Sequence, residues 1–167
     1  MENIKLFCVS LGCDKNLVDT EKMLGLLNGQ GIIFTDDETE ADVILINTCC
    51  FIGDAKEESV NTILEMARYK EEGNLKALLV AGCLAQRYKQ EILDEIPEVD
   101  AILGTTSYEE VAKVLEQVLM GSSGIHLSCF RDLRELPQVE ARRVVTTGGH
   151  YAFLKIAEGC DKRCTYC

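Results

Sequence analysis

The chain has 167 residues, of which 47% are apolar, 27% charged and 6% aromatic, and its 28 acidic against 17 basic residues give a formal net charge of −11. This composition excludes a disordered or fibrous protein, and no stretch approaches the roughly 20 uncharged apolar residues that a membrane-spanning helix needs. The acidity opposes binding to a nucleic-acid backbone and favours a basic protein partner, although it also serves solubility alone.

Short apolar runs alternate with amphipathic segments over the first 121 residues. The apolar runs predict strands at 4–9, 32–35, 42–47, 77–81 and 101–103. The intervening patterns predict helices at about 15–27, 55–69 and 86–95, and a fourth that opens with a capping box of Ser107 and Glu110 and ends at Gly121.

This alternation predicts an α/β fold with a five-stranded, doubly wound parallel sheet of the flavodoxin or Rossmann kind. Right-handed crossovers place the helices on both faces, and analogy with other such sheets favours the strand order 2-1-3-4-5. Residues 1–121 form this domain in our interpretation. Residues 122–150, with Pro137 and the pair Gly148-Gly149, form an irregular or hairpin-like linker. A further unit begins in 151–167 with a strand at 152–157.

A chain of this size can be stable without disulfide cross-links, so its nine cysteines need another explanation. The N-terminus has neither a basic leader nor a small-residue cleavage site, so we expect a cytoplasmic protein. Thiols in that compartment serve metals or redox chemistry more often than disulfides, and an odd number cannot all pair. The two histidines supply a conventional Cys/His zinc site poorly.

Three cysteines follow predicted strands that are neighbours in the expected sheet: Cys13, Cys49 and Cys83. Ligands of open parallel sheets bind beyond the carboxyl ends of the strands, so these thiols should converge there. Soft thiolates select zinc or iron-sulfur clusters, and three of them leave one coordination position open. The alternative is that all three are small buried hydrophobic residues. Cys50 competes with Cys49 for the same role.

A second group of cysteines follows the predicted strand 152–157: Cys160, Cys164 and Cys167, in the pattern Cys-x-x-x-Cys-x-x-Cys. Three thiolates this close can surround one cuboidal cluster, each on a different iron, again with one iron left open. A zinc knuckle and a redox Cys-x-x-Cys pair are the alternatives. Of the others, Cys8 is expected to pack in the core, and Cys129 is given no role.

The second group resembles the cluster motif of the radical S-adenosylmethionine (SAM) superfamily. The resemblance implies that Cys160, Cys164 and Cys167 hold a 4Fe-4S cluster whose open iron chelates SAM, and that Tyr166 packs near the adenine. Four stretches are in addition similar to signatures of the methylthiotransferases: 10–19, 47–52, 81–88 and 154–160. That family places Cys49, not Cys50, with Cys13 and Cys83 as ligands of a first 4Fe-4S cluster.

Within that family, Lys15-Asn16-Leu17-Val18-Asp19 and Phe51-Ile52 look like the RimO type, which methylthiolates an aspartate of ribosomal protein S-twelve. Asp14 and Gly148 depart from that type, where proline is common. The resemblance implies two 4Fe-4S clusters and SAM as cofactors, radical chemistry on an unactivated carbon, and as partners the ribosomal protein or small subunit and a flavodoxin-like electron donor.

Two other functions stay open at this point. One is a tRNA methylthiotransferase of the MiaB type, the only case in which nucleic acid is a partner. The other is a non-catalytic module that stores or carries metal or sulfur. The resemblance also implies that a complete member continues with a radical SAM barrel and a small β-barrel (TRAM) domain, so we expect this chain to be an N-terminal fragment without catalysis of its own.

Overall fold

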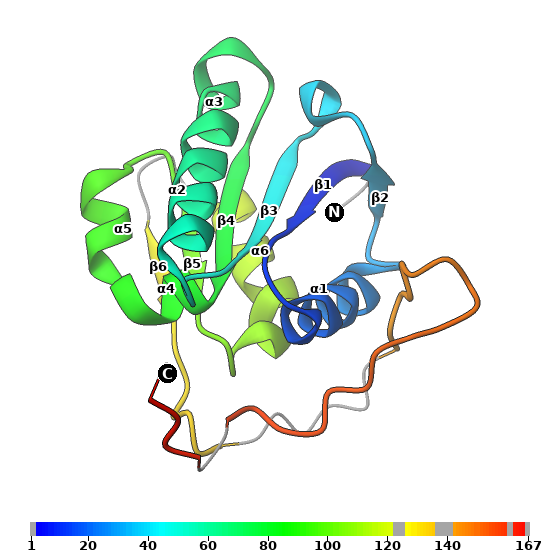
Figure 1. Ribbon diagram of the computed structural model, residues 1–167. Helices are drawn as coiled ribbons and strands as arrows, with labels where there is room; N and C mark the ends of the chain where they lie inside the picture. The colour runs from blue at the N-terminus through cyan, green and yellow to red at the C-terminus, as the bar shows by residue number, and fades with distance from the viewer. Residues whose placement is uncertain (1–2, 122–125, 136–141, 160–161, 166–167) are drawn as a thin grey trace.

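A six-stranded sheet forms the centre of the computed structural model, which describes residues 3–121, 126–135, 142–159 and 162–165 (Figure 1). The strand order is β2-β1-β3-β4-β5-β6, and every neighbouring pair is parallel. The strands are β1 (Ile4–Ser10), β2 (Ile32–Thr35), β3 (Val43–Thr48), β4 (Ala77–Gly82), β5 (Ala101–Leu103) and β6 (Leu127–Cys129). The predicted order of the first five strands is confirmed.

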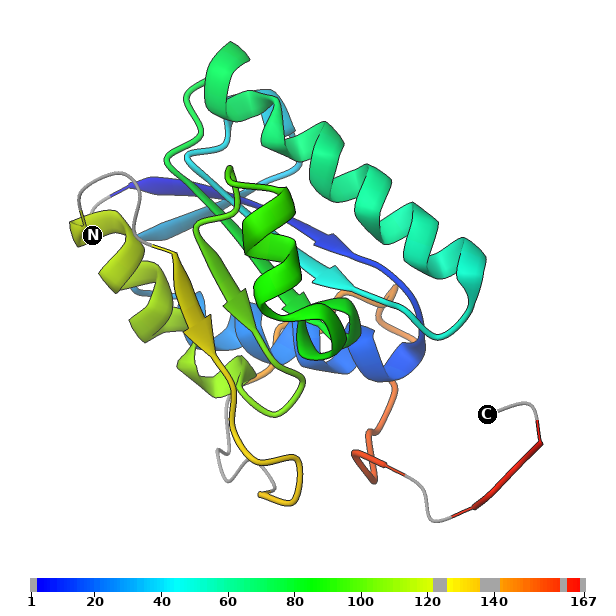
Figure 2. The same cartoon turned by 90° about the vertical axis from the view of Figure 1, so that its left-hand side faces the viewer.

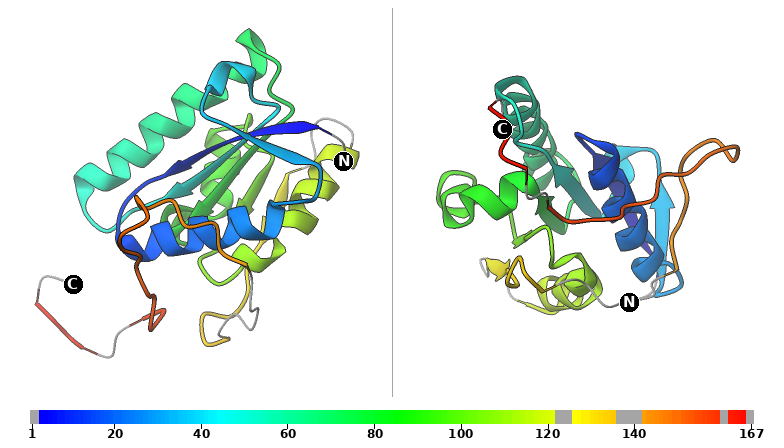
Figure 3. Two further views of the ribbon diagram at one scale, coloured as in Figure 1. Left: turned by 90° about the vertical axis from the view of Figure 1, so that its right-hand side faces the viewer. Right: turned by 60° about the horizontal axis from the view of Figure 1, so that its bottom comes forward.

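Two layers of helices cover the sheet, as Figures 2 and 3 show from opposite sides. One face carries α1 (Asp14–Leu27) and α6 (Val111–Met120), which contact each other. The other carries α2 (Gly53–Ala67), α4 (Cys83–Tyr88) and α5 (Gln90–Glu95). A short α3 (Tyr69–Glu72) follows α2, and two 3-10 turns, η1 (Glu38–Glu40) and η2 (Tyr108–Glu110), complete the elements.

The central strands are apolar without interruption because both of their faces are covered. Every residue of β3 and β4 is buried. Alternate side chains point to opposite layers: Leu45 and Leu79 pack toward α1 and α6, whereas Ile44 and Leu78 pack toward α2 and α5. This two-sided core fixes the register of the strands and so the positions of the loops at their carboxyl ends.

Two predictions about local structure in the first 121 residues are wrong. The helix expected at 86–95 begins already at Cys83 and is divided at Lys89, whose φ of 40° interrupts the helical path. The capping box does not form: the Ser107 hydroxyl accepts a hydrogen bond from the Arg131 backbone N–H at 2.9 Å, and Glu110 pairs with the Arg131 guanidinium.

Two further differences lie beyond residue 121. Strand β6 pairs with β5 inside the stretch expected to be an irregular linker. The strand expected at 152–157 is absent, since 151–157 have no regular secondary structure. A strand needs a partner for its backbone groups, and among the described residues none pairs with this segment. Within the same residues, no helix is long and apolar enough to cross a membrane.

Candidate metal centre

Three of the predicted ligand cysteines lie at the carboxyl ends of the adjacent strands β1, β3 and β4. Cys13 is the N-cap residue of α1 and is exposed, Cys49 directly follows β3 and is buried, and Cys83 is the first residue of α4 and partly buried. The neighbouring Cys50 is partly buried and packs against the core on the α2 side. The sheet therefore brings three distant parts of the sequence to one edge.

Glycines before two of these cysteines allow the loops to approach one another. Gly12 has a φ of 91°, and a Cβ placed on it would lie 2.5 Å from Cys49 Cβ and 2.9 Å from Cys49 Sγ. Gly82 has a φ of 93°, and its Cβ would lie 2.3 Å from Asn47 Oδ1 and 2.6 Å from the Thr48 carbonyl oxygen. Only glycine adopts this backbone at no steric cost, so both positions need it.

Two buried hydroxyl groups form hydrogen bonds that position the Cys49 loop. The Ser59 hydroxyl of α2 accepts a hydrogen bond from the Cys49 N–H at 3.0 Å and donates one to the Cys49 carbonyl oxygen at 2.8 Å. Thr48 donates its hydroxyl proton to the Ala81 carbonyl oxygen at 2.6 Å, which ties the end of β3 to the end of β4. These hydrogen bonds fix the backbone around Cys49.

The electrostatics of the site favour the protonated form of the Cys83 thiol. Burial, followed by the neighbouring Cys50, Cys49 and Cys13, raises the pKa of the Cys83 thiol to about 11. In the part of the chain that the structure describes, no three Cys, His, Asp or Glu side chains are grouped closely enough to hold a single metal ion. Binding of a metal by cysteine requires the thiolate form, so it would have to release the proton of Cys83.

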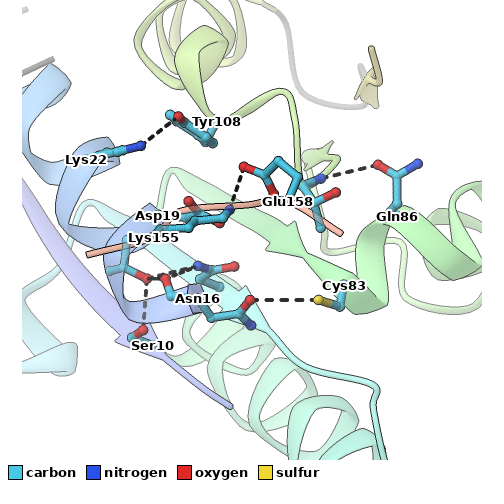
Figure 4. Close-up of polar contacts among 12 residues, drawn as sticks. Ser10, Asn16, Asp19, Lys22, Cys83, Gln86, Tyr108, Lys155 and Glu158 are labelled. Carbon is cyan, nitrogen blue, oxygen red and sulfur yellow. Dashed lines mark hydrogen bonds and ion pairs between the residues drawn. The ribbon is translucent and has the colours of Figure 1, made fainter. Parts of the chain in front are cut away.

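A cavity of about 280 Å³ adjoins Cys83. Its walls come from α4, from the turn after β5, from the segment after β6 and from the segment before the second cysteine group: Gln86, Thr105, Thr106, Leu133, Glu158 and Gly159. Gln86 is fixed on this wall because its side-chain oxygen accepts a hydrogen bond from the Thr105 N–H at 3.2 Å (Figure 4). The space beside Cys83 is therefore bounded both by the sheet domain and by the segment that leads to the second cysteine group.

Of the second cysteine group, only Cys164 falls within the described residues, where it is exposed. Cys160, Cys167 and Tyr166, also predicted site residues, lie outside the described residues. Residues 142–159, here called the strap, run along α1 toward this group (Figure 3).

The strap is attached to α1 through Glu21, which is fully buried. Its carboxylate accepts hydrogen bonds from the Thr146 N–H at 2.5 Å, the Thr146 hydroxyl at 2.8 Å and Arg143 Nε at 2.6 Å. Burial alone would raise the pKa of Glu21, but these bonds outweigh it and the net pKa is lowered. Gly25, one turn further, leaves room for the strap: a Cβ there would lie 1.5 Å from the Arg142 carbonyl oxygen.

A second attachment lies at Asp19, two residues before Glu21 on α1 (Figure 4). Lys155 Nζ contacts Asp19 Oδ2 and Glu158 Oε1, both at 2.6 Å, and its side chain is only 5% exposed. Burial, only partly offset by Lys155, raises the pKa of Asp19 to about 6. The Asp19 Oδ1 atom is buried and has no hydrogen-bond partner among the described residues.

The sequence analysis did not single out the polar side chains of α1 as functional. Four of them are buried against the sheet or the strap: Asn16, Asp19, Thr20 and Glu21. The sequence signal that could have identified them is the presence of polar residues at helix positions that normally carry buried apolar side chains. The remaining cysteines agree with expectation in part: Cys8 packs against the core, where burial raises its pKa to about 12, and Cys129 lies in β6.

Comparisons with known proteins agree with this arrangement. Residues 5–104 match the model of the family described as uncharacterized protein family UPF0004. The chain belongs to this family. The match includes all three cysteines at the sheet edge.

Relatives similar to the chain over 98% of its length carry the name ribosomal protein uS12 methylthiotransferase RimO. Those from Lachnoclostridium phytofermentans, Acetivibrio thermocellus and Clostridioides difficile are 63%, 51% and 48% identical to it. The chain spans 37%, 37% and 36% of their respective lengths. Among the methylthiotransferases, the chain is therefore most similar to the RimO type.

Proposed function

We propose that the chain provides the cluster-binding domain of a methylthiotransferase, and that Cys13, Cys49 and Cys83 together hold one 4Fe-4S cluster. The observation that carries the proposal is the position of these cysteines at the ends of three adjacent parallel strands, two of them after glycines with positive φ.

In the same proposal, Cys160, Cys164 and Cys167 hold a second 4Fe-4S cluster that binds SAM, with Tyr166 against the adenine. This part is supported by the cysteine spacing and by the similarity to RimO-type relatives. The two clusters supply low-potential electron transfer and an open iron for sulfur when they are bound. We assign residues 1–121 to the first cluster domain, 122–150, which include β6, to the linker and 151–167 to the start of the SAM-binding unit.

The substrate that we propose is an aspartate of ribosomal protein uS12, the protein named in the relatives. A net charge of −11 suits a basic ribosomal protein. A flavodoxin-like electron donor and a cytoplasmic location complete the proposal. The exposed Cys13 makes the site accessible from solvent. The ion pair of Asp19 and Lys155 positions the strap near Cys83.

Anaerobic reconstitution of the chain, followed by iron and sulfide analysis and Mössbauer spectroscopy, tests the first cluster. The comparison is with the variant Cys13→Ala/Cys49→Ala/Cys83→Ala. We expect the wild-type chain to take up a 4Fe-4S cluster at this site and the variant to lose it. Binding of zinc alone, or an unchanged cluster in the variant, would contradict the assignment.

The substrate is tested with the complete protein to which this chain belongs. Purified uS12 and tRNA are each incubated with the enzyme, SAM, a sulfide source and reductant, and the added mass of a methylthio group is measured. We expect modified uS12 and unmodified tRNA. The reverse result would support the MiaB type, and cluster binding without modification of either would support a metal or sulfur module.

A further inference from the structure

One side chain, Asn16, contacts all three loops that carry the cysteines at the sheet edge, and Figure 4 shows its contact with Cys83. Asn16 lies in the first turn of α1 and is 4% exposed. Its amide nitrogen Nδ2 donates hydrogen bonds to the Leu11 carbonyl oxygen at 3.1 Å and to the Thr48 carbonyl oxygen at 2.9 Å. Its Oδ1 accepts a contact from the Cys83 thiol at 3.7 Å. A single amide thus joins the loops before Cys13 and Cys49 to the side chain of Cys83.

These contacts fix the orientation of the amide. Both protons on Nδ2 are directed to carbonyl oxygens, so a flipped amide would place Oδ1 against two other acceptors. The Asn16 main chain is held as well, because its carbonyl oxygen accepts hydrogen bonds from Asn47 Nδ2 at 2.8 Å and from the Thr20 hydroxyl at 3.0 Å. The oxygen facing Cys83 is therefore determined by the fold.

The side chain does not act as an ordinary helix cap. Polar residues in the first turn of a helix commonly satisfy the helix's own free N–H groups. Asn16 instead directs its whole hydrogen-bonding capacity outward, to residues 5, 32 and 67 positions away in the sequence. This use of a buried amide implies a role in the arrangement of the loops.

We propose that Asn16 is a positioning residue that sets the three cysteine loops at the separation needed for one iron-sulfur cluster and directs its amide oxygen toward the Cys83 ligand. The inference rests on the proposed cluster site. Because the amide offers an acceptor and not a donor to that sulfur, it disfavours added electron density there. Asn16 should therefore lower the reduction potential of the cluster as well as retain it.

The test compares two variants of the 167-residue chain with wild type after anaerobic reconstitution. Asn16→Asp keeps the size of the side chain but places an oxygen against the Leu11 and Thr48 carbonyls. Asn16→Ala removes both the ties and the amide oxygen. We expect the cluster to be lost to a chelator roughly tenfold faster, or more, in both variants, with the greater loss in Asn16→Asp. In the cluster that Asn16→Ala retains, the reduction potential should shift upward.

Asp100→Ala is the matched control. Asp100 accepts a hydrogen bond from the Leu78 N–H at 2.7 Å and pairs with Lys70 at 2.5 Å, so it also joins neighbouring segments of the chain, but at the opposite ends of the strands and with a partly buried side chain. We expect this variant to lose unfolding free energy while cluster retention and potential stay at wild-type values. Equal cluster loss in the control, or wild-type retention and potential in both Asn16 variants, would overturn the role of Asn16.

A cluster-free measurement separates this inference from the proposed function. Hydrogen exchange of the loop amides around Leu11 and Thr48 should accelerate in Asn16→Asp before any iron is added, and unchanged exchange would count against the inference. A wild-type chain that takes up no cluster would remove the proposed function and, with it, the role of Asn16. A cluster that binds to the wild-type chain and is unchanged in the Asn16 variants would contradict the role of Asn16 and leave the proposed function intact.

Discussion

Cys13, Cys49 and Cys83 follow strands of the six-stranded sheet, whereas Cys164 follows the strap, most of which has no regular secondary structure. Ladder hydrogen bonds and a two-sided apolar core position the first group. Within the described residues, the strap is held to α1 mainly by two carboxylates, Glu21 and Asp19. The geometry of the first group is thus a property of the sheet, while the approach of the second depends on a few buried polar contacts.

The largest effect on stability is expected from Gly82→Ala, which crowds the backbone at the sheet edge. The new Cβ would meet Asn47 and Thr48 on β3 in a backbone of positive φ, so we expect a loss of about 3–5 kcal/mol in unfolding free energy. Urea unfolding measures it. Gly29→Ala is the control, because Gly29 also has a positive φ, 84°, but nothing lies within 4 Å of its Cβ position. Equal losses in both variants would refute the crowding argument.

Glu21→Ala tests the docking of the strap on α1. It leaves Arg143 and Thr146 without their buried acceptor, so we expect docking of the strap to weaken by about 3 kcal/mol. The Thr146 amide donates to the Glu21 carboxylate and the Val144 amide to the Glu21 backbone carbonyl oxygen. Hydrogen exchange should accelerate at Thr146, which loses its acceptor, and at Val144 as the strap detaches, while exchange in β3 and β4 stays slow. Glu40→Ala, which removes an exposed pair with Lys5, is the control. Equal acceleration in that control would contradict the docking role.

The pH dependence of Asp19 sharpens the comparison. Its pKa is raised to about 6 by burial, against the attraction of Lys155 and Lys22 and with the repulsion of Glu158. The folded chain therefore binds a proton more readily than the unfolded chain between about pH 4 and 6, and the contribution of Asp19 to stability falls as the pH rises through this range.

Asp19→Asn removes this dependence. The stability of the variant relative to wild type should rise by about 2–3 kcal/mol between pH 4 and pH 7. Urea unfolding across this range measures the difference. A difference that does not change with pH would mean that the Asp19 carboxyl is not perturbed in the folded chain.

The smallest effect is expected from Thr146→Val. It removes one hydroxyl bond to Glu21, at 2.8 Å, and leaves the backbone N–H of the same residue in place. We expect a loss of about 1 kcal/mol in strap docking, seen as faster exchange of the Val144 amide. Thr147→Val provides the comparison, since the Thr147 hydroxyl bonds to Tyr151 within the strap and not to α1. A Thr147 effect as large would show that the strap is held by its own internal contacts.

The elements that the sequence predicts best are those with a strong local pattern. Strands 32–35 and 101–103 are found at the predicted residues, and α1 begins one residue early. Strand β6, Leu127–Cys129, has the same length as 101–103 but not its continuous apolar run, and it becomes a strand because β5 offers an unpaired edge. The capping box fails because Arg131, distant in sequence, takes both of its side chains.

The residues of the candidate site also fall into a group that local sequence patterns predict and a group that they do not. The cysteines at the sheet edge follow from the strand order, because a turn after each strand is a local feature and the order makes the turns neighbours. The roles of Asn16, Asp19 and Glu21 could not be predicted, since each depends on a partner that only the folded chain supplies. Cys160, Cys167 and Tyr166 remain predictions.

The contact between Glu21 and Arg143 spans 122 positions in the sequence. Closing so long a loop costs more chain entropy than joining β1 to β2 or to β3, whose partners follow within a few tens of residues. We therefore expect the strap to dock late in folding, onto an α1 already packed on the sheet. On a ribosome that synthesises the chain from its N-terminus, the loops of Cys13, Cys49 and Cys83 would be complete and open to an iron-sulfur donor before residues 142–159 have emerged.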